Sequence, residues 1–232
     1  MKAFESKNRH NELKENSIKL ILIVASTLSI LTTFGILFSI LFEAIEFFQM
    51  RSFWYFITGT EWSPGVDGSK FGALPIFAGT FMITIIAMLV AVPIGLGSAI
   101  FMSEYASFSL RDTLKPMLEI LAGIPTVVYG FFAAITVAPF IVSVFKSIGV
   151  TASFNSALAS GVVMGIMIIP VIASLSDDVL RAVPDAQRKA SLALGMTKSE
   201  TIKSIVVPSA MPGIISATIL GFSKALGETM IV

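Results

Sequence analysis

The sequence predicts an all-α protein, a polytopic bundle of membrane-spanning helices. Hydrophobic residues make up 55% of its 232 residues and charged residues only 13%, about half the charged share of an average soluble domain. The few charges leave five long apolar runs between them. This composition argues against a soluble enzyme, because too few charged side chains remain to cover a water-exposed surface. A net charge of +1 argues against a nucleic-acid binder, and the absence of cysteine excludes disulfides and thiolate metal sites.

Each apolar run is long enough for a membrane-spanning helix, which needs about 20 apolar residues. The runs cover residues 18–42, 71–103, 120–145, 149–176 and 204–232. The first part of run 149–176 is polar enough to form a loop, and the last run contains two charges. We therefore expect an N-terminal tail over 1–17, a first transmembrane helix over 18–42, an outer interfacial loop over 43–70 and a helical core over 71–232.

Lysine and arginine residues outside the spans predict the orientation of the chain. The basic residues on the side of the N-terminus are Lys2, Lys7, Arg9, Lys14, Lys19, Arg111, Lys115, Arg181, Arg188, Lys189, Lys198 and Lys203. The opposite side has only Arg51, Lys70 and Lys146. Because positive residues are enriched in short cytoplasmic loops, this bias predicts a multi-pass protein of a prokaryotic inner membrane with its N-terminus in the cytoplasm. The loop over 43–70 is rich in aromatic residues, so we expect it along the outer interface.

The last apolar run continues to Val232 without a closing turn or a positive cluster. A chain that starts in the cytoplasm and has five spans ends outside, whereas a sixth span returns it to the cytoplasm. We therefore expect a sixth span beyond the C-terminal end and interpret the sequence as truncated there.

Motifs for catalysis or phosphate binding are absent from the sequence. It has no Gly-Lys dipeptide, and therefore no G-x-x-x-x-G-K-[ST] loop to hold a nucleotide, and it has neither HExxH nor Gly-x-Ser-x-Gly. The single histidine, His10, lies in the charged tail, where we expect it to be solvated. We therefore expect no catalytic residues, metal site or cofactor in this chain.

A long polar loop over 177–208 follows the fourth apolar run. Pro184 and Asp185 can open a helix, since proline suits the first turn and Asp complements its positive end. Gly195 can end that helix in a left-handed cap. Thr197 can cap a second helix, with Glu200 at capping-box spacing. The loop therefore predicts a helix, a glycine break and a second helix, and a short exposed helix of this kind suits insertion into a groove on a partner.

The same loop resembles the EAA loop of ABC importer permeases, whose pattern is E-A-A, three residues, Gly, nine residues and Ile-x-Leu-Pro. The resemblance implies a role in ATPase coupling for Lys189, Ala190, Ser191, Gly195 and Pro208. The spacing matches throughout, but Lys189 stands for Glu, Ser191 for the second Ala and Val207 for Leu.

Four other stretches are similar to phosphate importer permeases of the PstC type. They are 62–75, 91–106, 122–132 and 225–230. This resemblance implies the MetI-like fold of type I importers, with six spans. It also implies a PstA-like sister permease, a PstB-like ATPase dimer that binds ATP and Mg²⁺, and an external PstS-like phosphate-binding protein. The remaining partner is membrane lipid.

Lys224 and Glu228 are charges within an apolar run, at i, i+4 spacing that predicts one shared helix face. Lys224 lies eleven residues after Gly213, roughly 17 Å along a helix and so near the middle of the membrane. Because a central charge costs about 2.5–3.5 kcal/mol on insertion scales, we expect a translocation role. Lys224 would attract a passing anion, and Glu228 would keep the empty site near neutral. The alternative is a neutral pair that fixes helix packing.

Several weaker candidates complete the sequence-based predictions. Thr126 and Tyr129 interrupt an apolar run and can either line the pathway or bond to their own helix. We expect Asp177 and Asp178 to be solvated, and Met164 to make packing contacts together with Met167 and its isoleucine neighbours.

Four functions are compatible with the sequence. The first is the permease subunit of an ABC importer of phosphate, and the second is the same subunit for molybdate, sulfate or phosphonate. The third is an ATPase-independent carrier or channel, which would require inverted repeats or a polar pore helix in each half. The fourth is a membrane assembly or signalling subunit that transports nothing and would not need the buried charged pair.

Overall fold

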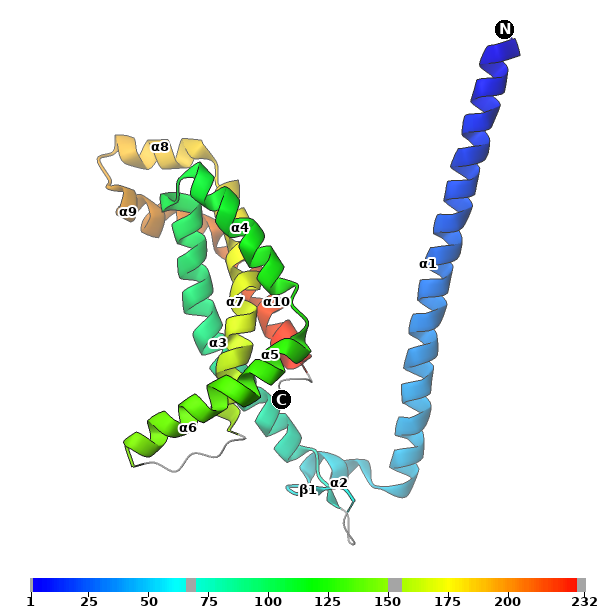
Figure 1. Ribbon diagram of the computed structural model, residues 1–232, viewed down its shortest axis with the longest axis vertical. Coiled ribbons are helices and arrows are strands. Elements are labelled where there is room, and N and C mark those ends of the chain that lie inside the picture. The colour runs from blue at the N-terminus through cyan, green and yellow to red at the C-terminus, as the bar shows by residue number, and fades with distance from the viewer. Residues whose placement is uncertain (1, 66–69, 150–155, 229–232) are drawn as a thin grey trace. The chain divides into compact units, whose positions relative to one another are not determined.

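The computed structural model describes residues 2–65, 70–149 and 156–228. The chain divides into two compact units, Met1–Leu74 and Pro75–Val232, whose elements are labelled in Figure 1. Five helices of the described residues are long and apolar enough to cross a membrane, which confirms the predicted number of spans. They cover Glu15–Met50, Leu74–Tyr105, Thr126–Ser147, Ala157–Ala182 and Lys198–Leu226.

The first unit is dominated by a single long helix, α1 (Lys2–Met50). The transmembrane helix expected over 18–42 lies inside it, and the helix continues into the stretch expected as an outer loop. No proline interrupts residues 2–50, so no residue type stops the helix where the apolar run ends. A short helix, α2 (Phe53–Thr58), and a two-stranded antiparallel pair, β1 (Trp62–Ser63) with β2 (Lys70–Phe71), complete the unit.

Aromatic side chains of the first unit pack on one another. Phe47 makes edge-to-face contacts with Phe48, Phe56 and Phe71, at ring-centroid distances of 5.2, 5.5 and 5.8 Å. Trp62 contacts Phe71 in the same geometry at 5.8 Å. Contacts of this kind add about 0.5–1.5 kcal/mol each beyond area burial. They join the end of α1 to the two-stranded pair.

All regular secondary structure among the described residues of the second unit is helical. Its elements are α3 (Leu74–Ile100), η1 (Phe101–Tyr105), α4 (Phe108–Ala122), α5 (Thr126–Phe132), η2 (Ala133–Val137), α6 (Ala138–Ser147), α7 (Ala157–Ala182), α8 (Asp185–Ala193), α9 (Lys198–Thr201), η3 (Ile202–Val206) and α10 (Val207–Leu226). The three η segments are single π-helical stretches that continue a neighbouring α-helix.

The third span begins at Thr126 rather than at residue 120. α4 ends at Ala122, and Pro125 serves as the N-cap of α5 in an extended conformation. Proline lacks the N–H that would continue the helical ladder, and it disfavours helical geometry in the residue before it. Residues 120–122 therefore belong to α4, a separate helix that carries Arg111 and Lys115 and packs along α7 (Figure 1).

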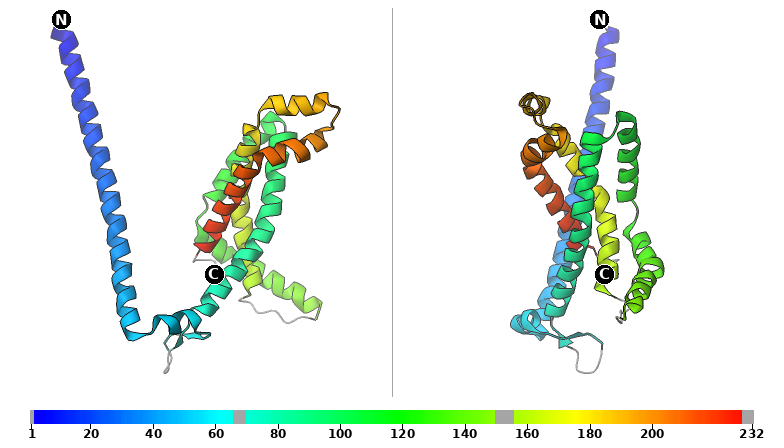
Figure 2. Two further views of the ribbon diagram at one scale, coloured as in Figure 1. Left: turned by 180° about the vertical axis from the view of Figure 1, so that it is seen from behind. Right: turned by 90° about the vertical axis from the view of Figure 1, so that its left-hand side faces the viewer.

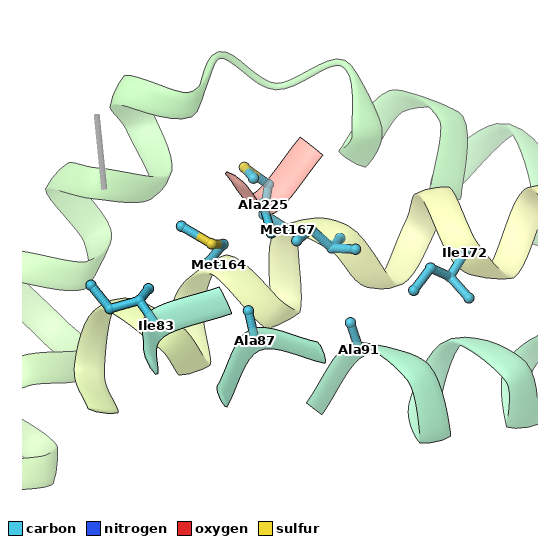
Figure 3. Close-up of a cluster of buried hydrophobic side chains, with 8 residues drawn as sticks. Ile83, Ala87, Ala91, Met164, Met167, Ile172 and Ala225 are labelled. Atoms are coloured by element: carbon cyan, nitrogen blue, oxygen red, sulfur yellow. The ribbon is translucent and has the colours of Figure 1, made fainter. Parts of the chain in front are cut away.

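α7 is the central helix of the second unit and buries more of its surface than any other candidate span. A core cluster joins Ile83, Ala87 and Ala91 of α3 to α7 and to Ala225 of α10 (Figure 3). The contribution from α7 comprises Met164, Met167, Ile168 and Ile172. All four are at most 1% exposed, which confirms the predicted packing role of the methionines.

Glycines let α7 approach α3 to backbone distance. A Cβ placed on Gly161 would lie 2.7 Å from Ile86 Cβ, and one on Gly165 would lie 2.9 Å from the Ala87 carbonyl oxygen. Gly95 of α3 is similarly close to Ile172, whereas Gly97 faces open space. The pair at 161 and 165 has the small-xxx-small spacing that membrane helices use for close packing.

Replacing Gly165 by alanine should destabilise the second unit by about 1–3 kcal/mol, because the new methyl group meets a rigid backbone carbonyl. Gly97→Ala is the matched control, since it adds the same methyl group to a helix at a position with no atom within 4 Å. Thermal unfolding in detergent, followed by circular dichroism, measures both. Equal stability of the two variants would contradict the close-packing assignment.

Candidate functional site

The loop between α7 and α10 forms a hairpin of two helices at one end of the second unit (Figure 2). α8 begins after Pro184 and ends at Ala193, and Gly195, which follows the C-cap residue Leu194, has φ +85°. The Met196 N–H donates to the Ser191 carbonyl at 3.2 Å, and the Gly195 N–H donates to the Leu192 carbonyl at 3.0 Å. This pair of bonds is a Schellman motif, and it confirms the predicted left-handed cap at Gly195.

The second limb of the hairpin begins with the predicted capping box. Thr197 Oγ1 accepts from the Glu200 N–H at 3.3 Å, and the Glu200 carboxylate accepts from the Thr197 N–H at 2.7 Å. The helix then continues through η3 into α10, with Pro208 exposed in the first turn.

Ser191 holds the two limbs of the hairpin together. Its hydroxyl lies 2.9 Å from the Thr201 hydroxyl, and the two residues are 3% and 4% exposed. Lys189 and Ala190, by contrast, are exposed on α8. The five predicted coupling residues therefore divide into an inward-facing link, Ser191, and residues on the outer surface or at the turn.

Both limbs are anchored to the end of the second span at Glu104, whose side chain is 8% exposed. Its carboxylate pairs with Arg188 of α8, and its backbone carbonyl accepts a hydrogen bond from Lys198 of α9. Arg188 also donates to the Leu180 carbonyl at 2.7 Å, and Lys198 lies over the Tyr105 ring, 4.8 Å from its centroid. The hairpin is therefore fixed to the membrane-spanning helices from two sides.

Sequence reasoning missed the roles of Glu104 and Arg188. Glu104 is a lone acid at the end of an apolar run, which is a usable signal, but its partner lies 84 residues away. In the sequence analysis, Arg188 served only as one of the basic residues that predict the orientation of the chain. Their pairing follows from the packing of α3 on α7, which the sequence pattern does not specify.

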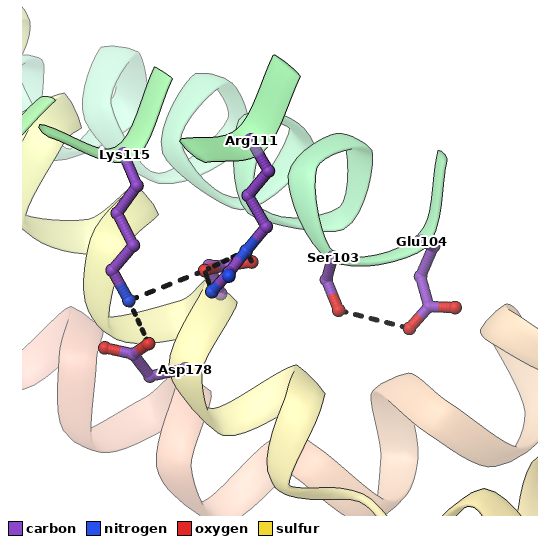
Figure 4. Close-up of polar contacts among 6 residues, drawn as sticks. Ser103, Glu104, Arg111, Lys115 and Asp178 are labelled. Atoms are coloured by element: carbon purple, nitrogen blue, oxygen red, sulfur yellow. Dashed lines mark hydrogen bonds and ion pairs between the residues drawn. The ribbon is translucent and has the colours of Figure 1, made fainter. Parts of the chain in front are cut away.

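Asp177 forms the second anchor of this end of the bundle, and the prediction that it is solvated is wrong. Figure 4 shows Arg111 and Lys115 on α4, with Lys115 paired to Asp178. Asp177 is 0% exposed and accepts from Arg111 Nη2 at 2.7 Å and Nε at 3.2 Å. These hydrogen bonds raise the pKa of Arg111 above its ordinary value, so the guanidinium stays charged. Asp178 has a side chain that is 55% exposed and pairs with Lys115. Charged pairs from α4 thus clamp that helix onto α7.

The predicted pathway residues lie on α5 and at the end of α10. Thr126 is the half-buried first residue of α5, and Tyr129 packs against the core cluster that includes Ala225. The Tyr129 hydroxyl donates to the Leu121 carbonyl of α4 at 3.0 Å, so it bonds across the 123–125 break and not to its own helix.

Lys224 lies half-buried in the last turn of α10. The expectation of one shared helix face with Glu228 is wrong, since α10 ends at Leu226 and Glu228 follows the capping Gly227. Thr229 and Met230, part of the fourth family-like stretch, lie outside the described residues, as does Val232. Within the described residues, no group of His, Asp or Glu is arranged to hold a metal ion.

Comparison with known proteins places this architecture among transport components. Residues 91–232 match the family described as the binding-protein-dependent transport system inner membrane component. The chain is 41% identical over 177 residues to a probable ABC transporter permease protein, YqgH, of Bacillus subtilis. It is 34% identical over 207 residues to the phosphate transport system permease protein PstC 1 of Mycobacterium tuberculosis. A PstC protein of Xylella fastidiosa is 32% identical over 229 residues, with 92% of this chain and 70% of the relative covered.

The chain spans only part of these relatives. The first two matches cover 76% and 77% of this chain but 56% and 61% of the relatives. Among solved structures, an inward-facing MetNI methionine ABC transporter matches with a TM-score of 0.48 and 19% identity, over 67% of this chain and 68% of the other.

Arg111→Ala should lower the free energy of unfolding by about 3 kcal/mol, because it leaves the Asp177 carboxylate buried without its main partner. Lys115→Ala should cost less than Arg111→Ala, since its closest carboxylate, Asp178, is more than half exposed and its amine lies at the longer distance of 3.7 Å from Asp177. Denaturant titration in detergent measures both changes. The double variant Arg111→Met, Asp177→Leu removes both charges and should recover most of the loss; failure to recover would mean that Arg111 acts through packing and not through the ion pair.

Proposed function

Because the chain belongs to the family of binding-protein-dependent transport system inner membrane components, we propose that it acts as a PstC-like permease subunit of an ATP-driven importer of inorganic phosphate. The choice of phosphate is supported by relatives from Mycobacterium, Mesorhizobium and Xylella that are named phosphate transport system permease proteins. The chain is a multi-pass membrane protein, and the proposal places it in the inner membrane with its N-terminus in the cytoplasm.

The anchored hairpin is the observation that carries this proposal. α8 presents the exposed Lys189 and Ala190 to one side, while Ser191 and the Glu104 contacts hold it from the other. A short helix held in this way can transmit a displacement, because movement of α8 must pull on Glu104 at the end of the second span. In the proposal a PstB-like ATPase dimer binds α8, and ATP and Mg²⁺ bind to that dimer and not to this chain.

The translocation path is proposed to form with a PstA-like sister permease, below a PstS-like phosphate-binding protein. Lys224 is the cation that would attract the anion, since it lies half-buried at the end of α10 opposite the hairpin. Glu228 would limit how tightly the anion is held. Thr126 and Tyr129 are proposed to line the path near the break between α4 and α5.

The family by itself also accommodates a second substrate class, since the name of the Bacillus relative gives a permease without a substrate. An importer of molybdate, sulfate or phosphonate would use the same hairpin and the same intramembrane cation. Uptake of radiolabelled phosphate in the presence of each competing oxyanion distinguishes the two. Phosphate uptake that is inhibited only by phosphate supports the first proposal.

Gly195→Val should reduce phosphate uptake by the complete complex several-fold. Valine at φ +85° costs about 1–2 kcal/mol and disfavours the turn that orients α8. Gly195→Asn is the matched control, because asparagine tolerates left-handed geometry, and it should retain most of the uptake. Co-purification of the ATPase with each variant shows whether docking is affected. Full ATPase binding and uptake with Gly195→Val would refute the coupling role.

Lys224→Ala should lower phosphate uptake by about tenfold or more, because it removes a charge whose attraction for an anion is worth several kcal/mol in a low-dielectric site. Lys224→Arg keeps the charge and should retain a large part of the activity. Uptake is measured at matched membrane levels of each variant. Wild-type uptake by Lys224→Ala would leave the helix-packing role as the remaining explanation for this residue.

A further inference from the structure

A polar cavity of about 440 Å³ opens at the end of the second unit that carries α8. Three arginines line it, Arg111, Arg181 and Arg188, together with Ser103 and a single acid, Asp185. The Ser103 hydroxyl donates a hydrogen bond to the Glu104 carboxylate at 3.2 Å. The cavity therefore gathers cations from α4, α7 and α8 at one place.

The three arginines differ in whether they form ion pairs with acidic side chains of the same chain. Arg111 is paired with the buried Asp177, and Arg188 is paired with Glu104. Arg181 is exposed in the last turn of α7, and none of the ion pairs found among the described residues includes it. Arg181 can therefore contact an external anion without breaking a contact that holds the fold.

An apolar groove of about 540 Å³ runs between α3 and α4 from the same place. Met102 lines both the groove and the polar cavity. On α4 the groove is lined by Leu114, Leu118 and Leu121, which follow Arg111 at spacings of three, seven and ten residues and so lie on one helix face. Arg111 lines the cavity and these leucines line the groove. One face of α4 is therefore charged beside the cavity and apolar along the groove.

The length of the groove matches one half of a bilayer. Its wall along α3 and η1 runs from Pro93 to Met102, about 14 Å at 1.5 Å per residue, close to the roughly 15 Å of hydrocarbon in one leaflet. Gly97 leaves the wall open, since no atom lies within 4 Å of the position a Cβ would take.

We propose that the cavity and the groove together bind one anionic phospholipid, with its phosphate group at Arg181 and an acyl chain between α3 and α4. Basic pockets between membrane helices recognise acidic headgroups, and arginine is suited to phosphate oxygens. A soluble phosphate ion would leave the groove unused, whereas a zwitterionic lipid gains less from the arginines. The inference requires only that the chain lies in a membrane, and it does not depend on the transported substrate.

Native mass spectrometry of the full chain in detergent tests the proposal, with phosphatidylglycerol and phosphatidylcholine added in equal amounts. The wild-type chain should retain phosphatidylglycerol over phosphatidylcholine by about fivefold, as expected for one arginine near an acidic headgroup. Arg181→Gln should remove this preference. Gly97→Leu should reduce retention of both lipids, because the new side chain fills the groove.

Two matched variants serve as controls. Lys203→Gln removes an exposed positive charge that does not line the cavity, and Gly79→Leu adds a side chain to α3 at a position that is open but lies outside the groove. Both should retain the wild-type lipid pattern. Equal retention of the two lipids by the wild-type chain would overturn the proposal. So would loss of phosphatidylglycerol on addition of inorganic phosphate with no effect of Gly97→Leu, which would assign the cavity to a soluble anion.

Discussion

The close contact between α7 and α3 is the constraint on which the second unit depends. Gly161 and Gly165 remove the side chains that would separate the two helices, so backbone meets backbone across the core. In a membrane, where apolar burial between helices gives little driving force, such close packing is a main source of stability. It also fixes where the second span ends, and therefore where Glu104 meets the hairpin.

Charged pairs then organise the end of the bundle that carries the hairpin. Asp177 and Glu104 are both nearly inaccessible to solvent, and each accepts from a cation that lies on another helix. A buried pair contributes less to stability than its contacts suggest, but removal of one partner is costly. The pairs therefore specify one arrangement of α4, α7 and α8, which the proposed coupling role requires.

The predicted coupling residues have two physical roles within this arrangement. Ser191 is small and buried and joins the limbs of the hairpin, so its position demands a small side chain. Lys189 and Ala190 face outward and remain available to a partner. The basic cavity lies beside α8, so the proposed headgroup site is next to the element proposed to move during transport.

The sequence by itself determined the features that depend on local chemistry. The length of the apolar runs predicts the five spans, Gly195 predicts the left-handed cap, and Thr197 with Glu200 predicts the capping box. Each of these features depends only on residues that are close together in the chain. The tertiary structure decided what depends on distant partners. The sequence around Asp177 predicts a solvated acid, but in the structure Asp177 pairs with Arg111, 66 residues away. Glu104 is a lone acid at the end of an apolar run in the sequence, but in the structure it pairs with Arg188. Charge pairing of this kind depends on which helices are neighbours, and that is set by packing at Gly161 and Gly165 rather than by the pattern around the charges.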